Sequence, residues 1–166
     1  MANAEDSSIS LLQRVTLQAE VLVPLLQHLR AELGEAQANA LVYPVLRDCV
    51  RRWTVALASS ESDSAIETWQ RASDAVTAQA AADVDWEVLR DDESGLDFDV
   101  TACRFADFFR RLGEPELGAI LTCEIDDHIA EQAATAVSFS RPETIMQGGA
   151  RCPFRYRFAD RDDGKG

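Results

Sequence analysis

The spacing of apolar residues changes once along the chain, near Asp83, and this change limits the folds that the chain can adopt. Before Asp83, apolar residues recur at spacings of three, four and seven, which is typical of helices that bury one face. After it, short segments alternate apolar and polar residues, which is typical of strands that bury one face. Helices followed by strands predict an α+β fold.

Three helices are predicted in the first half of the chain. The first covers residues 8–33 and contains Pro24, where the missing backbone donor predicts a kink or a short break. The second contains Pro44, where we expect a bend, and it places Cys49 on its inner, apolar face. The third covers residues 65–82.

Four strands and two helices are predicted in the second half. The strands cover residues 83–91, 97–103, 137–141 and 152–158, and the helices cover residues 103–112 and 114–132. Turn residues between the first two strands predict a hairpin. We therefore expect an N-terminal helical layer followed by an antiparallel sheet of about four strands with two inserted helices, in the order β-β-α-α-β-β.

The length of 166 residues predicts a single domain, 1–166. Within it we expect a helical part at 1–82, an α+β part that carries the candidate site at 83–158, and a mobile tail at 159–166. The helical part also offers a surface for homo-oligomers.

Alternation along the strands predicts which side chains are buried and which form pairs. Trp86 and Val88 in the first strand are expected on the buried face. In the last strand, Arg155 and Arg157 occupy outer positions, and acidic residues occupy the outer positions of the first two strands. Opposite charges on neighbouring strands stabilise their pairing, so we expect ion pairs across the sheet.

Charge and composition exclude several classes of partner. The net charge is −13, with 29 acidic and 16 basic residues, so nucleic acid and anionic membranes are poor partners. The acidic N-terminus lacks the basic and apolar regions of a secretory signal, which predicts a cytoplasmic protein. Four irregularly spaced cysteines without such a signal predict free thiols rather than disulfides.

Three cysteines and two aspartates suggest a reactive site in the second half. Cys103 lies where a strand becomes a helix, and a helix N-terminus lowers the pKa of a thiol. Cys123 precedes Asp126 and Asp127 by three and four residues, which places thiol and carboxylates on one helix face. Because Cys152 also lies at a strand end, we expect the three thiols to converge on one pocket.

Arg141 is expected at the end of the third strand, with its side chain turned toward the covered face. A buried guanidinium needs a partner, because an unpaired buried charge is costly. The carboxylate of a substrate could supply it through two parallel hydrogen bonds. Asp126, Asp127 and Glu143 are the internal alternatives.

Three interpretations fit these residue types. A thiolate could attack an electrophilic carbon beside a general acid or base. The three cysteines with an aspartate could bind a metal, although the chain has no closely spaced cysteine pair. The cysteines could also be small apolar residues packed in a core.

The second half resembles the L-2-amino-thiazoline-4-carboxylic acid hydrolase family. The matching elements, in order, are Val100-Thr101-Ala102-Cys103, the helix end from Phe108 to Gly113, Glu116-Leu117-Gly118, Cys123-x-x-Asp126, Arg141-x-x-Thr144, Gly148 and Cys152-x-Phe154. Order and spacing agree along about sixty residues, with a looser extension into the second helix.

The resemblance implies hydrolytic opening of a small cyclic amidine-like ring that carries a carboxylate, yielding an N-carbamoyl amino acid from the thiazoline. The resemblance therefore implies a hydrolase acting on a non-peptide C–N bond, with no cofactor required and the metal content open. The candidate catalytic residues are Cys123, Cys103, Asp126 and Asp127, and the candidate substrate-binding residues are Arg141, Thr144, Gly148 and Cys152. The alternatives are a non-catalytic small-molecule-binding module, with or without a thiolate-bound metal, and a helical interaction protein.

Overall fold

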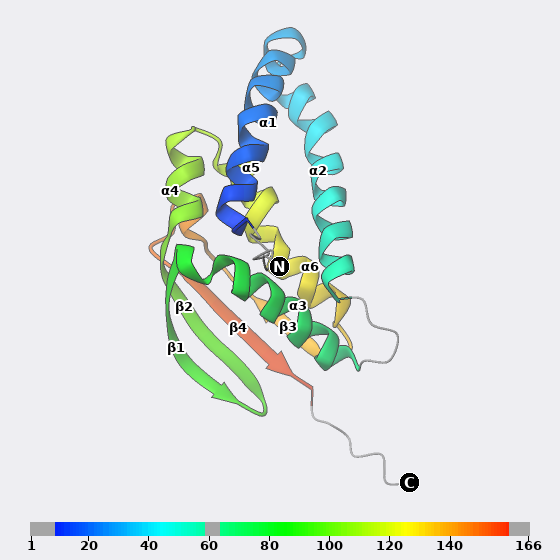
Figure 1. The fold of residues 1–166 in the computed structure, drawn as a ribbon, viewed down its shortest axis with the longest axis vertical. Helices are drawn as coiled ribbons and strands as arrows, with labels where there is room; N and C mark the ends of the chain where they lie inside the picture. Colours follow the sequence, from blue (N-terminus) through cyan, green and yellow to red (C-terminus); the bar gives the residue numbers. More distant parts are fainter. Residues whose placement is uncertain (1–8, 59–63, 160–166) are drawn as a thin grey trace, which may run out of the picture.

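The computed structural model describes residues 9–58 and 64–159. Three N-terminal helices precede a four-stranded antiparallel sheet, which confirms the predicted α+β class (Figure 1). The helices α3 and α6 lie over one face of the sheet, and α1 and α2 form an antiparallel hairpin that projects beyond it. The expected tail and most of the segment between α2 and α3 lie outside the described residues.

The first two helices are continuous through their prolines. The α1 helix spans Leu11–Leu33 and α2 spans Glu35–Ala58, each with its proline inside. Of the kink or short break expected at Pro24, the break is therefore wrong. Cys49 was expected on the inner face of α2 and is instead exposed. None of the described helices is long and apolar enough to span a membrane.

The third helix, α3, spans Ala65–Ala80 and continues into the short 3-10 helix η1, Ala81–Asp83. The strands are β1 (Val84–Asp92), β2 (Gly95–Cys103), β3 (Val137–Ser140) and β4 (Cys152–Phe158). They are arranged in the order β1-β2-β4-β3, so β1 and β3 are the edge strands. The predicted hairpin and the predicted bounds of the last strand are confirmed.

The predicted ion pairs between strands are present on β2 and β4. Arg155 lies 2.7 Å from one oxygen of Asp99, and Arg157 pairs with Asp97. Arg151, which precedes β4 and was not part of the prediction, lies 2.7 Å from the other oxygen of Asp99. The Asp99 carboxylate is 5% exposed, so its two arginine partners keep a buried charge satisfied. These pairs fix the register of the two central strands.

The edge strand β1 follows the expected alternation over its first half, because Val84, Trp86 and Val88 all lie on the same face of the strand. Trp86 and Val88 are nevertheless 43% and 53% exposed rather than buried, since β1 lies at the edge of the sheet. Irregular pairing with β2 occurs between Asp85 and Trp86 and again between Val88 and Arg90. The second irregularity leaves Leu89 without an opposite residue, so the strict period of two ends at Val88.

The inserted helices contain a wide turn that the sequence did not indicate. After α4 (Arg104–Arg111), the single helix predicted for residues 114–132 consists of α5 (Pro115–Gly118), the π-helical segment η2 (Ala119–Cys123) and α6 (Glu124–Gln132). The N–H of Glu124 donates to the carbonyl of Ala119, five residues earlier. Single π turns inside helices are frequent at functional sites.

Two ion pairs fix the inserted helix against the N-terminal hairpin. Arg30 on α1 lies 2.6 Å from the buried carboxylate of Glu114, which precedes α5. Arg47 on α2 lies 2.9 Å from Glu124, the first residue of α6. The two contacts bracket η2, so the hairpin determines where the π turn lies relative to the sheet.

Gly118, the last residue of α5, allows two helices to approach closely. A Cβ atom built on it would lie 2.6 Å from Cβ and Cγ of Phe109 and 2.8 Å from Cε of Met146. Phe109 is fully buried and Met146 nearly so, and neither has room to move aside without a change in core packing.

We predict that Gly118→Ala destabilises the protein by about 1–3 kcal/mol, the usual cost of overpacking a core. Helix propensity alone predicts the opposite sign, because alanine stabilises a helix by about 1 kcal/mol relative to glycine. Urea unfolding of the two proteins decides between these outcomes. An unchanged or higher unfolding midpoint would show that the close contact does not limit the packing of α5.

Candidate functional site

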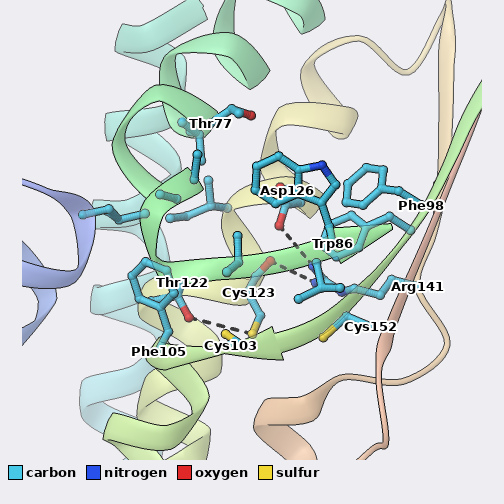
Figure 2. Close-up of a pocket in the computed structure, with 18 of the residues that line it drawn as sticks. Thr77, Trp86, Phe98, Cys103, Phe105, Thr122, Cys123, Asp126, Arg141 and Cys152 are labelled. Carbon is cyan, nitrogen blue, oxygen red and sulfur yellow. Dashed lines mark hydrogen bonds and ion pairs between the residues drawn. The ribbon is translucent and has the colours of Figure 1, made fainter. Parts of the chain in front are cut away.

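A cavity of about 290 Å³ lies between α3, the sheet and the η2–α6 segment (Figure 2). Most of its lining is apolar, and the polar side chains come from a few positions. The lining residues on the η2–α6 wall are Thr122, Cys123, Ile125 and Asp126, and Arg141 reaches the cavity from the residue after β3. The other walls come from α3, β1, β2, β4 and the first residues of α1 and α4.

The three cysteines singled out from the sequence all line this cavity. Cys103 ends β2, Cys152 begins β4 and Cys123 ends the π turn, so three different elements bring the thiols together (Figure 2). All four cysteines of the chain are free.

Burial keeps these thiols protonated. It raises the pKa of Cys123 to about 12, against a smaller opposing effect of Arg141. Burial also raises the pKa of Cys103 and of Cys152. The expectation that the helix N-terminus lowers the pKa of Cys103 is therefore wrong. The N–H of Ala106 does donate to its sulfur at 3.5 Å, but loss of solvent outweighs that bond.

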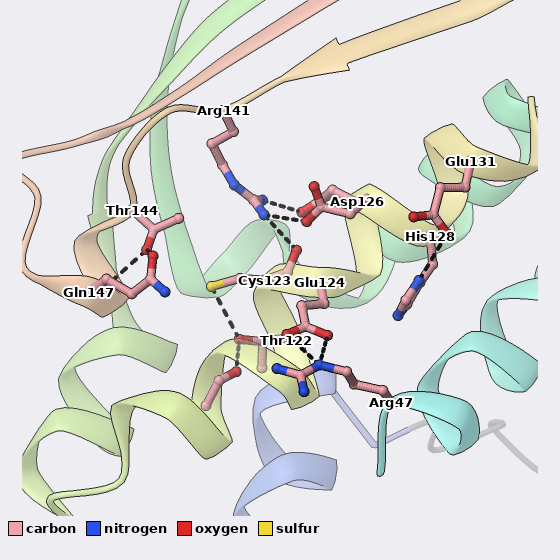
Figure 3. Close-up of polar contacts among 12 residues, drawn as sticks. Arg47, Thr122, Cys123, Glu124, Asp126, His128, Glu131, Arg141, Thr144 and Gln147 are labelled. Carbon is pink, nitrogen blue, oxygen red and sulfur yellow. Dashed lines mark hydrogen bonds and ion pairs between the residues drawn. The ribbon is translucent and has the colours of Figure 1, made fainter. Parts of the chain in front are cut away.

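Arg141 is held by internal partners at the edge of the cavity (Figure 3). Its Nη1 lies 3.1 Å from Asp126 Oδ2, and its Nη2 lies 2.7 Å from Asp127 Oδ2 and 2.9 Å from the carbonyl oxygen of Cys123. The guanidinium also lies over the rings of Phe139 and Phe154, at 5.3 and 5.0 Å. The side chain is only 6% exposed, and its Nε has no partner among the described residues.

Asp126 and Asp127 differ in their surroundings although both contact Arg141. Asp126 lines the cavity, and burial raises its pKa to about 6 despite the opposing charge of Arg141. Asp127 is 47% exposed and does not line the cavity. Partial burial raises its pKa as well. A carboxyl group with a pKa near neutrality can both accept and donate a proton at physiological pH.

Thr144 and Gly148 are not among the described residues that line the cavity. The Thr144 hydroxyl accepts a hydrogen bond from the Gln147 N–H at 3.2 Å, which caps the 3-10 helix η3, Ile145–Gln147. Gly148 follows with a φ of 96°, which favours glycine. Both residues shape the loop before β4, where the Ile145 N–H donates to the sulfur of Cys152 at 3.2 Å.

Sequence reasoning missed the apolar wall of the cavity. Trp86, Phe98 and Val100 were assigned to strands but not to a site, and Thr122 was not considered. Apolar residues that line a cavity recur along the sequence at the same spacing as apolar residues packed in a core, so the sequence carries no signal that separates them. The Thr122 hydroxyl donates to the Gly118 carbonyl at 2.7 Å, within the π turn that was also missed.

A metal site receives no support from the side-chain positions. Among residues 9–58 and 64–159, no three His, Cys, Asp or Glu side chains are grouped so that they could hold a metal ion. The cavity instead combines neutral thiols, an ionisable carboxyl group and a paired guanidinium beside apolar walls. Such a site can bind a small molecule with one polar part and can transfer a proton.

Comparison with known proteins places the chain by its sequence. Curated proteins gave no match. Among solved structures, the chain is similar to the crystal structure of the phenol-responsive sensory domain of the transcription activator PoxR with phenol. The identity is 14% over 82% of this chain and 72% of that chain, with a TM-score of 0.44, which is too distant to guide the assignment of function.

The family model for L-2-amino-thiazoline-4-carboxylic acid hydrolase matches residues 14–156. The match extends from α1 to β4, and so includes the helical layer as well as every element around the cavity. The chain therefore belongs to the L-2-amino-thiazoline-4-carboxylic acid hydrolase family.

Proposed function

We propose that the protein is a hydrolase that opens a small cyclic amidine-like substrate, with Asp126 as the general acid–base residue. The observation that carries this proposal is the position of the Asp126 carboxyl group on the cavity wall beside Arg141, where burial raises its pKa to about 6. Effective general acid–base catalysis uses a group whose pKa lies near the working pH. Membership of a family named for hydrolysis supports the reaction type.

The amidine group of such a substrate matches Asp126. A protonated amidine presents N–H donors, and one of them can donate to the Asp126 oxygen that accepts from Arg141, which leaves the other oxygen to take the proton from water. A substrate carboxylate could reach Arg141 only by replacing one of its internal partners. Asp127 is the more exposed of the two at 47%, against 28% for Asp126, so it is the partner that a substrate carboxylate would displace.

The reaction consumes one water molecule. Water attacks the carbon of the protonated amidine, Asp126 accepts one proton of that water, and the electrons of the carbon–nitrogen double bond move to the nitrogen, which becomes neutral. The ring bond to that carbon then breaks as the new hydroxyl group becomes a carbonyl: the hydroxyl proton passes to solvent, and Asp126 returns its own proton to the departing ring atom. For a thiazoline to yield an N-carbamoyl product, the broken bond is the one to the ring sulfur, which differs from the C–N bond expected from the sequence.

The thiols have a secondary part in this scheme. A cysteine nucleophile at position 123 or 103 would first have to lose a proton, and the raised pKa of both thiols opposes that step at neutral pH. Water is therefore the proposed nucleophile. The thiols contribute weakly polar surface between Asp126 and the apolar walls.

A non-catalytic binding module is the second candidate, and the same thiol protonation favours it. Neutral thiols and apolar walls can hold a ligand without any chemical step. The two candidates differ in whether product forms when a cyclic amidine is incubated with the protein.

We predict that Asp126→Asn lowers kcat by at least about 100-fold, the usual contribution of a general acid–base residue. In the unaltered enzyme, kcat/KM should rise as the pH increases through about 6, because the ionised carboxylate is the form that accepts the proton. The variant should lose this inflection.

Asp127→Asn is the matched control, because it also removes one carboxylate from Arg141 but leaves the cavity wall intact. For a substrate that carries a carboxylate, this variant should change KM more than it changes kcat. If both variants lose kcat equally, the charge balance around Arg141 matters and Asp126 has no acid–base role of its own.

We predict that Cys123→Ser retains kcat within about tenfold, because water rather than sulfur attacks. A serine hydroxyl is a far poorer nucleophile than a thiolate, so a cysteine mechanism would lose orders of magnitude. Single-turnover measurements with saturating enzyme separate chemistry from binding. A loss beyond 100-fold with unchanged affinity would assign the nucleophile to Cys123.

A further inference from the structure

The cavity offers much more apolar surface than a bare thiazoline carboxylate can use. Its volume of about 290 Å³ corresponds to about ten water molecules at ~30 Å³ each. The polar contacts available to the head of a substrate come from the η2–α6 wall and Arg141. The facing surface of α3, β1 and β2 is built almost entirely from apolar side chains, among them Val76, Val84, Trp86, Val88, Phe98 and Val100.

Two of these apolar side chains connect the cavity with the protein surface. Trp86 and Val88 line the cavity and are still 43% and 53% exposed, so the cavity opens beside the edge strand β1. Arg141 follows β3, but its guanidinium reaches inward over the ring of Phe154 on β4, so β2 lies between it and Trp86 on β1. A small ligand can therefore contact the polar side chains and Trp86 together, since they line one cavity.

The chemistry of this wall selects the part of the substrate that lies against it. A charged or strongly polar group there would lose its hydration without gaining partners, since Thr77 is the polar side chain that α3 contributes to the lining. An apolar group would instead remove its own surface and that of Trp86 from water, which favours binding by about 25 cal/mol for each Å² of apolar surface buried. A ring can also stack on the aromatic side chains.

We propose that the substrate is a cyclic amidine that carries an aromatic or branched aliphatic substituent, which lies against Trp86, Val88 and Phe98. The assignment of the amidine head rests on the proposed function above. The assignment of the substituent rests on the composition and the opening of the cavity, and it holds for a binding protein as well as for an enzyme.

Calorimetric titration with 2-amino-2-thiazoline and with its 4-phenyl and 5-phenyl derivatives tests this proposal. At least one phenyl derivative should bind at least tenfold more tightly than the unsubstituted ring. If neither phenyl derivative binds more tightly than the unsubstituted ring, the proposal is wrong.

Variants on β1 assign the effect to the wall. Trp86→Ala should weaken the binding of the preferred phenyl derivative at least fivefold and change the binding of the unsubstituted ring less than twofold. Leu89→Ala is the control, because Leu89 is 54% exposed on the same strand but does not line the cavity. It should affect neither ligand. Equal losses for both ligands in Trp86→Ala, or a loss for the phenyl derivative in Leu89→Ala, would contradict the assignment.

Turnover of the same compounds separates this proposal from the proposed function. If a phenyl derivative binds more tightly but no ring is opened, the substituent site stands and the hydrolase assignment fails. If all three rings are opened and all three compounds bind with equal affinity, the hydrolase assignment stands and the substituent site is wrong.

Discussion

The candidate site depends on the buried guanidinium of Arg141. It connects the end of β3 with the carbonyl oxygen of Cys123 at the end of η2 and with two carboxylates in the first turn of α6. An unpaired charge in this position would cost several kcal/mol, so the contacts hold these elements in one arrangement. Because the guanidinium is shared by two carboxylates, it does not fully offset the burial of Asp126, whose pKa stays raised.

The π turn and its supports place Asp126 on the cavity wall. The wide turn lies between Gly118, which packs closely on Phe109, and Glu124, which Arg47 holds from α2. The α1–α2 hairpin therefore acts on the site mainly through contacts made outside the cavity. The α3 helix and the sheet supply the remaining walls, and the cavity opens beside the edge strand β1. Acid–base chemistry thus comes from the η2–α6 segment with Arg141, and apolar binding surface comes mainly from α3 and the sheet.

The fold class and the order of elements could be predicted because both depend on local period. The bounds of β4 and the pairing of Arg155 and Arg157 with aspartates of β2 follow from strict alternation. Features that depend on packing could not be predicted. Pro24 lies in a continuous helix, although its missing donor predicts a kink or a short break. The helix N-terminus at Cys103 indicated a lowered pKa, but burial, which the sequence does not report, reverses the direction.

The most direct test of this account is a pH titration of the Asp126 carboxyl carbon by NMR, with ¹³C-labelled aspartate and Asp126→Asn for assignment. The account predicts an apparent pKa of about 6, well above the usual value for aspartate. Added 2-amino-2-thiazoline should lower it, because a cationic amidine favours the carboxylate. A pKa of about 4 or below, as expected when an ion pair outweighs burial, would contradict the assignment of Asp126 as the acid–base residue.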